Sequence, residues 1–118
     1  MKYMLIHCGD ESIAYAPQND CRIPGTPAAR ALETWLNDLT ARGVLLDGAR
    51  LRPVSDATTV QVREGNLVVS DGPFAETKEQ VAGYDVIDCA DLDEAIEIAS
   101  RHPSARTGTI EVRPLWEG

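Results

Sequence analysis

Apolar side chains occupy both odd and even positions in the run from Lys2 to Cys8 near the start of the chain. A strand with one face in water alternates between apolar and polar residues, so this run predicts a central strand covered on both faces. Whatever fold the rest of the chain adopts must therefore supply two covering layers. A second copy of the chain is the simplest source of the layer that the chain itself does not provide.

Two segments carry the signals of amphipathic helices. Thr26 can cap free backbone amides and Pro27 suits a first helical position, so we predict a helix over Pro27–Arg42 that ends at Gly43. Asp91 followed three residues later by Glu94 forms a capping box, which predicts a second helix over Asp91–Arg101.

The segments between and beside these helices read as strands. Alternating or apolar runs bounded by turn residues predict extended segments from Val44 to Pro53, a hairpin of Thr58–Arg63 with Leu67–Val69, and strands Tyr84–Cys89 and Thr109–Pro114. The order is strand, helix, strand, hairpin, strand, helix, strand. It predicts an α+β fold of the ferredoxin-like, split βαβ type, with an antiparallel sheet and an inserted β-hairpin, as one domain over residues 1–118.

Composition limits the classes of function. The chain has 11 Lys plus Arg against 19 Asp plus Glu, a formal charge of −8, and no basic stretch, so we expect no nucleic-acid partner. The first apolar run ends at Gly9 and is too short for a signal peptide or a membrane span, so we expect a cytoplasmic protein without a membrane partner. The three cysteines fit neither a disulfide framework nor a metal knuckle and are interpreted as reduced thiols. Because phosphate-binding, dinucleotide and zinc-protease motifs are lacking, we expect no cofactor and no metal.

The most unusual segment is Asp71-Gly-Pro-Phe-Ala-Glu-Thr-Lys-Glu79. Together with Gly83-Tyr84, Asp93-Glu-Ala95 and Ile110-Glu-Val-Arg-Pro114, it resembles the DGPF-motif branch of the YCII-related family, and the resemblance covers nearly the whole chain. The resemblance implies a ferredoxin-like fold and a homodimer of the dimeric α/β-barrel type, in which two sheets pack face to face. Some relatives carry a His and an Asp in a cleft, and some are encoded near alternative sigma factors, which implies a sigma-factor association as one alternative. The helix Pro27–Arg42 has no histidine to carry over.

His7 and Asp71 are the candidate catalytic residues. In a sheet of order 4-1-3-2, the end of the first strand lies beside the start of the third, where the loop after Asp71 arrives, so we expect both side chains in one cleft. A carboxylate beside a neutral imidazole can orient a general base. The alternatives are a half-buried His7 that bonds to backbone or tyrosine, and an Asp71 that only sets its turn. His102, in the last turn before Pro103, is interpreted as favouring the helix dipole.

Further polar side chains are expected near that cleft. The charged loop after Asp71 either is solvated or lines a polar cleft with Asp10 and Glu11, where it would hold a divalent cation loosely. Glu111 and Arg113 share one face of the last strand and are expected either to form an interface ion pair, which we favour, or to line a cavity. The candidate substrate-binding residues are Glu76, Lys78, Tyr84 and Arg113.

These residues support two functions of different classes. The first is a homodimeric enzyme that performs His/Asp proton transfer on a small polar metabolite without a cofactor. The alternative is a non-catalytic dimer that binds a ligand or a regulatory partner through the same loop. The sequence leaves the reaction unnamed.

Overall fold

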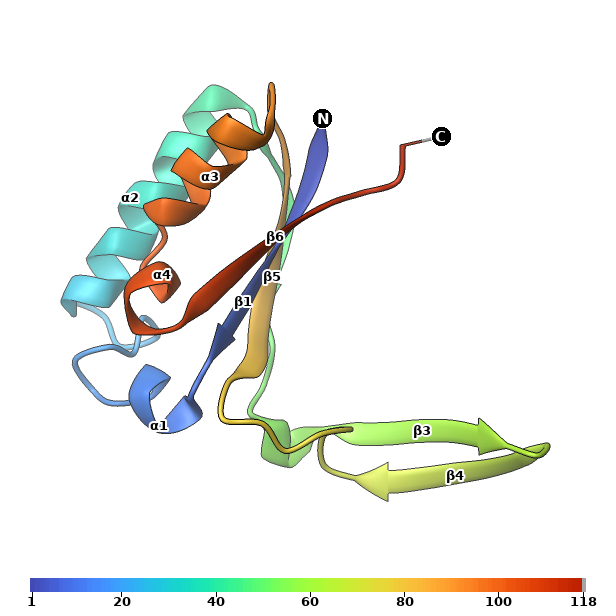
Figure 1. Cartoon of the computed structure of the whole chain (residues 1–118). Coiled ribbons are helices and arrows are strands. Elements are labelled where there is room, and N and C mark those ends of the chain that lie inside the picture. Colours follow the sequence, from blue (N-terminus) through green and yellow to red (C-terminus); the bar gives the residue numbers. More distant parts are fainter. Residues whose placement is uncertain (118) are drawn as a thin grey trace.

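The computed structural model describes residues 1–117 and shows an antiparallel sheet with helices on one face (Figure 1). The sheet has four strands in the order β2-β5-β1-β6, the order predicted for the four core strands. Two further strands, β3 and β4, form a separate hairpin. The strands are β1 (Lys2–Gly9), β2 (Leu45–Arg50), β3 (Thr58–Arg63), β4 (Asn66–Asp71), β5 (Gln80–Asp88) and β6 (Thr109–Pro114).

Both predicted helices form and begin at the predicted caps. Helix α2 spans Pro27–Arg42, and the Thr26 hydroxyl accepts a hydrogen bond from the backbone N–H of Ala29 at 3.1 Å. Helix α3 spans Leu92–Ser100 and is capped by the Asp91 carboxylate. Short helices that the sequence analysis did not predict are α1 (Glu11–Ala14), α4 (Ser104–Thr107) and the 3₁₀ turn η1 (Val54–Asp56). In residues 1–117 no helix is long and apolar enough to cross a membrane.

The core lies between the helices and one face of the sheet. Trp35 of α2 is buried there, and its indole N–H donates to the carbonyl of Ile98 in α3 at 2.8 Å, which joins the two helices. The buried apolar cluster comprises Tyr3, Leu5, Trp35, Leu39, Ile87, Cys89, Ala95, Ile98 and Ala99. The cysteines are free thiols in the described residues, as predicted.

Strand β1 divides its side chains between the two faces of the sheet. Tyr3, Leu5 and His7 are buried beneath the helices, whereas Met4 and Ile6 lie on the opposite, half-exposed face. Within residues 1–117 the helices cover only the first of these faces (Figure 1). The second layer that the sequence predicts therefore does not come from this part of the chain.

The hairpin of β3 and β4 projects away from the four-stranded sheet (Figure 1). Its register pairs Val60 with Val69 and Val62 with Leu67, so one hairpin face carries four apolar side chains. All four are more than half exposed. Asp71 is the last residue of β4 and is also exposed.

Candidate functional site

His7 and Asp85 form a buried pair on the helix-covered face of the sheet. The His7 Nε2 and an Asp85 carboxylate oxygen are 2.6 Å apart, and both residues are at most 9% exposed. A carboxylate only accepts hydrogen bonds, so His7 donates from Nε2, and in the neutral form of the imidazole the lone pair is on Nδ1. That Nδ1 is buried and has no hydrogen-bond partner in the described part of the chain. The pair thus presents an oriented imidazole with one free nitrogen.

A glycine makes room for this pair. In the register of β1 with β5, Gly83 lies opposite His7 and Asp85 lies opposite Leu5, so Asp85 reaches His7 diagonally across the two strands. On the other side, a Cβ added at Gly48 of β2 would lie 2.1 Å from an Asp85 carboxylate oxygen. The glycine at position 48 is therefore a steric requirement for the position of Asp85.

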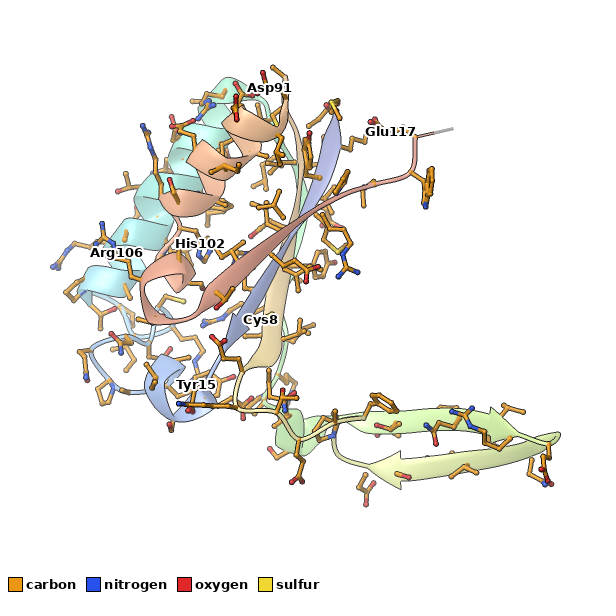
Figure 2. All side chains as sticks on the ribbon, in the orientation of Figure 1. Cys8, Tyr15, Asp91, His102, Arg106 and Glu117 are labelled. Atoms are coloured by element: carbon orange, nitrogen blue, oxygen red, sulfur yellow. The ribbon has the colours of Figure 1, made fainter. Side chains whose placement is uncertain are left out.

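His102 packs against His7 from the segment between α3 and α4, on the helix side of the sheet (Figure 2). The two imidazole rings are 4.2 Å apart between centroids, and Trp35 makes a T-shaped contact with His102 at 4.7 Å between centroids. His102 Nδ1 accepts a hydrogen bond from the backbone N–H of Ser104 at 3.0 Å, so a neutral His102 carries its proton on Nε2.

Burial, with smaller contributions from charge repulsion by the nearby His7 and Arg50, lowers the pKa of His102 to about 3. His102 therefore stays neutral across the ordinary pH range. The interpretation of His102 as a residue that favours the helix dipole is wrong, because the ring is buried against His7 and is held uncharged. A neutral imidazole with a fixed N–H is a hydrogen-bond donor to a developing negative charge.

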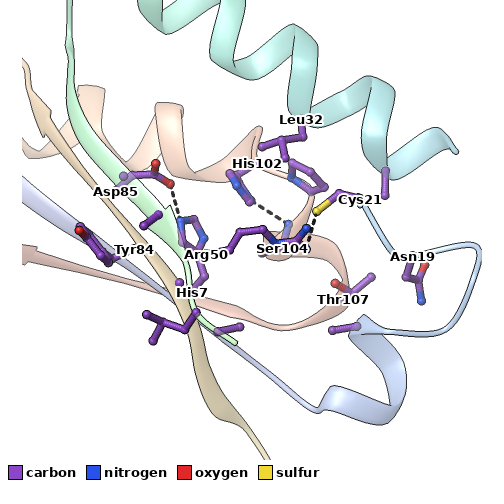
Figure 3. Close-up of a pocket in the computed structure, with 18 of the residues that line it drawn as sticks. His7, Asn19, Cys21, Leu32, Arg50, Tyr84, Asp85, His102, Ser104 and Thr107 are labelled. Atoms are coloured by element: carbon purple, nitrogen blue, oxygen red, sulfur yellow. Dashed lines mark hydrogen bonds and ion pairs between the residues drawn. The ribbon is translucent and has the colours of Figure 1, made fainter. Parts of the chain in front are cut away.

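His7, Asp85 and His102 line a cavity of about 380 Å³ between the sheet and the helices (Figure 3). Its volume is in the range of small-molecule sites. Its walls combine an apolar side with a few polar groups. The apolar lining includes Ala28, Leu32, Leu36, Ala49 and Leu51, and the polar lining includes Tyr15, Asn19, Cys21, Arg50, Ser104 and Thr107.

The three buried residues offer ligand atoms for a metal within 4.8 Å of one another. However, Nε2 of His7 is bonded to Asp85 and Nδ1 of His102 is bonded to the backbone of Ser104. With both bonds kept, one nitrogen of each imidazole and the second carboxylate oxygen of Asp85 remain available, which equals the three protein ligands typical of catalytic zinc. The donor atoms of this cluster therefore suit proton transfer and are also enough in number for a metal ion.

The predicted pairing of His7 with Asp71 is wrong, because Asp85 is the carboxylate bonded to His7. Asp71 ends the projecting hairpin and is not among the residues that line the His7 cavity. Gly72 and Pro73, which follow Asp71, line a second hollow of which His7 is not part. Whether Asp71 takes part in catalysis stays a prediction.

The candidate substrate-binding residues lie in three different places. Glu76 and Lys78 line a second, more open hollow with Asp10 and Glu11, the polar cleft that the sequence offered as an alternative. Tyr84 borders the His7 cavity, although its side chain lies on the opposite face of β5 from Asp85. Arg113 forms an ion pair with Glu111 on the half-exposed face of the sheet. None of the four binding roles is tested by this arrangement.

Sequence reasoning missed Asp85, His102 and Arg50. Asp85 could have been found from its place in the strand. It lies on the same face of β5 as Gly83 and Ile87, and neither of these neighbours is polar. A buried carboxylate at such a position needs a hydrogen-bond partner. His7 is the polar residue on the same face of the adjacent strand β1. The positions of His102 and Arg50 depend on packing between distant segments and carry no comparable local signal.

Comparison with known proteins places the chain in a family. A family model described as the YCII-related domain matches residues 1–117. The chain is also 40% identical over 119 aligned positions to Uncharacterized protein R00369 of Rhizobium meliloti (strain 1021), an alignment that covers 98% of this chain and 92% of that relative. The chain therefore belongs to the YCII-related domain family, as its sequence motifs suggested.

Proposed function

We propose that this YCII-related domain is an enzyme that transfers a proton within a small ligand bound in the His7 cavity. The observation that supports this function is the buried His7–Asp85 pair, which leaves the unpartnered Nδ1 of His7 as a base. A carboxylate that orients an imidazole and stabilises the imidazolium formed on proton uptake is a recurrent arrangement in general base catalysis.

The two histidines suit opposite tasks. His7 takes a proton from a carbon next to a carbonyl group, and the electrons of that C–H bond move toward the carbonyl oxygen. His102 donates a hydrogen bond from Nε2 to that oxygen, which stabilises the negative charge as it develops. The imidazolium of His7 then returns the proton to another atom of the same ligand, so an isomerisation needs no further reactant.

The test is hydrogen–deuterium exchange in D₂O on a panel of small oxo acids and ketones, followed by proton NMR. The matched variant is His7→Gln, because the Gln amide can still donate to Asp85 but has no basic nitrogen. We expect the wild-type protein to exchange at least one compound and the variant to lose a factor of about 10² to 10⁴ in rate. Equal rates for the two proteins would refute the proposal.

The second candidate is a ligand-binding domain without catalysis, a function for which the cavity alone would be sufficient. Compounds that raise the melting temperature without any exchange above the buffer rate would favour it. Under either function we propose that two copies pack the faces that carry Met4 and Ile6, as in a dimeric α/β barrel, because these apolar side chains are only partly covered. The His7 cavity lies on the opposite face and would remain accessible in such a dimer.

A further inference from the structure

Arg50 lies beside the His7 cavity at the end of β2 and is the residue with a permanent positive charge in its lining. Its backbone pairs with Gly83 of β5, and Gly83 in turn lies opposite His7 of β1. The guanidinium extends toward Cys21, with Nη2 and Sγ 3.0 Å apart (Figure 3). A thiol is a weak hydrogen-bond acceptor, so this contact leaves the guanidinium free for a stronger one.

The hydrogen bond from Arg22 and, to a smaller extent, the charge of Arg50 lower the pKa of the Asp20 carboxyl. Arg50 itself forms no ion pair with a carboxylate in residues 1–117, although the chain carries a formal charge of −8. Several other arginines do have one, and those pairs are Arg22–Asp20, Arg42–Asp38, Arg52–Asp56, Arg101–Glu97 and Arg113–Glu111. The carboxylate in the cavity lining, Asp85, is bonded to His7. A cation without an ion-pair partner in an acidic protein, at the edge of a cavity whose carboxylate is already bonded to His7, is suited to an anionic ligand.

The remaining lining indicates which anion fits. A phosphate monoester carries nearly two negative charges and calls for several donors or cations, whereas this cavity offers one guanidinium and a largely apolar wall. A carboxylate carries one charge and matches the planar fork of a single arginine. The apolar wall formed by Leu32, Leu36 and Leu51 would then contact the hydrocarbon part of the same ligand.

We propose that Arg50 binds the carboxylate of a small carboxylic acid whose largely apolar body fills the His7 cavity. This inference rests on the proposed function, since it names the class of substrate on which His7 acts. Arg50 holds the anionic end at the side of the cavity near Cys21, and the body of the ligand extends toward His7 and His102. The contact of Arg50 with Cys21 is replaced by the contact with the ligand.

The experiment compares phenylacetate with phenylacetamide, which has nearly the same shape but no charge, in calorimetric titrations at constant ionic strength. We expect phenylacetate to bind about fivefold to tenfold more tightly, the gain of a charge-assisted hydrogen bond partly exposed to solvent. Arg50→Gln should abolish this preference. Arg52→Gln is the matched control, because Arg52 lies two residues further along, is exposed and pairs with Asp56 outside the cavity.

Equal affinities for the two probes, no detectable binding of either, or a preference that persists in Arg50→Gln would overturn the proposal. Tighter binding of phenyl phosphate than of phenylacetate would also overturn it, because the site would then be specific for phosphate. Titrations of His7→Gln separate this proposal from the proposed function. A preference for phenylacetate in that variant, without His7-dependent exchange of any compound, would retain the Arg50 site and refute the enzyme. Exchange that depends on His7, without a preference for phenylacetate, would retain the enzyme and refute the Arg50 site.

Discussion

Replacing Gly48 with alanine should separate Asp85 from His7 without altering either residue. The added Cβ would lie 2.1 Å from one Asp85 carboxylate oxygen and 3.1 Å from its Cγ. The oxygen must retreat by about 1.3 Å or more to reach an ordinary contact distance of 3.4 Å. Because the carboxylate is rigid, the 2.6 Å hydrogen bond from His7 lengthens or breaks as the group moves.

The expected loss of stability follows from these contacts. A hydrogen bond to a charged group contributes about 1.5–3 kcal/mol, and an overpacked methyl group costs about 1–3 kcal/mol more. A Gly-to-Ala change also stabilises the folded state by about 0.4–1 kcal/mol, because it restricts the unfolded chain. We therefore expect Gly48→Ala to lower the free energy of unfolding by about 2–4 kcal/mol, which a domain of ordinary stability survives.

The assay is equilibrium unfolding in urea, with Gly9→Ala as the control. Gly9 also lies in a strand, but a Cβ added there meets nothing within 4 Å, so its replacement should be neutral or slightly stabilising. The same two changes are then made in an Asp85→Ala background, where the obstructing carboxylate is gone. There Gly48→Ala should cost about 2 kcal/mol less than in the wild-type protein. Equal costs for Gly48→Ala and Gly9→Ala, or a cost that Asp85→Ala leaves unchanged, would refute the steric argument.

Three shorter predictions concern pH, assembly and Asp71. The pKa of His102 is lowered from 6.5 to about 3 in the folded chain. As the pH falls from 6.5 to 3, His102 therefore takes up a proton in the unfolded chain but not in the folded chain. Stability should therefore fall by up to about 1.4 kcal/mol per pH unit between pH 6.5 and 3, and a urea series on His102→Gln should show a shallower slope. In sedimentation velocity at micromolar concentration, the wild-type protein should be a dimer and the Ile6→Lys variant a monomer. The control variant Gln61→Lys, on the polar face of the hairpin, should stay dimeric. A monomeric wild-type protein would contradict the proposed assembly. Because Asp71 lies outside the His7 cavity, Asp71→Asn should leave deuterium exchange within about twofold of wild type, and a tenfold loss would instead support its predicted catalytic role.

The fold was predictable to the extent that its signals are local. Helix α2 has the predicted bounds because Thr26, Pro27 and Gly43 act on adjacent backbone groups. Strand β5 begins earlier than predicted, at Gln80 rather than Tyr84, because its first residues pair with the end of β1. The composition of a strand does not show how far its pairing with a neighbouring strand extends.

The site was predictable only in part. His7 was recognised from its place at the end of β1, and the topology correctly brought the third core strand beside it. The carboxylate was assigned to the loop before that strand because the DGPF motif is conspicuous, whereas Asp85 lies within an apolar run. Side chains alternate between the faces along β5, so Asp85 lies on the same face as the buried Ile87. This alternation is the sequence feature that predicts a buried carboxylate at Asp85. His102 comes from a turn whose position depends on how α4 packs against β1, which no local pattern encodes.

The protonation of the two imidazoles is the most direct test of the proposed acid–base site. The chain contains two histidines, so long-range ¹H–¹⁵N spectra at mildly alkaline pH resolve both rings, and His102→Gln assigns them. We predict that His7 carries its proton on Nε2 and has a bare Nδ1, and that Asp85→Ala abolishes this preference at His7 while His102 keeps its proton on Nε2. A proton on Nδ1 of His7, or a distribution between its nitrogens that Asp85→Ala does not change, would contradict the account.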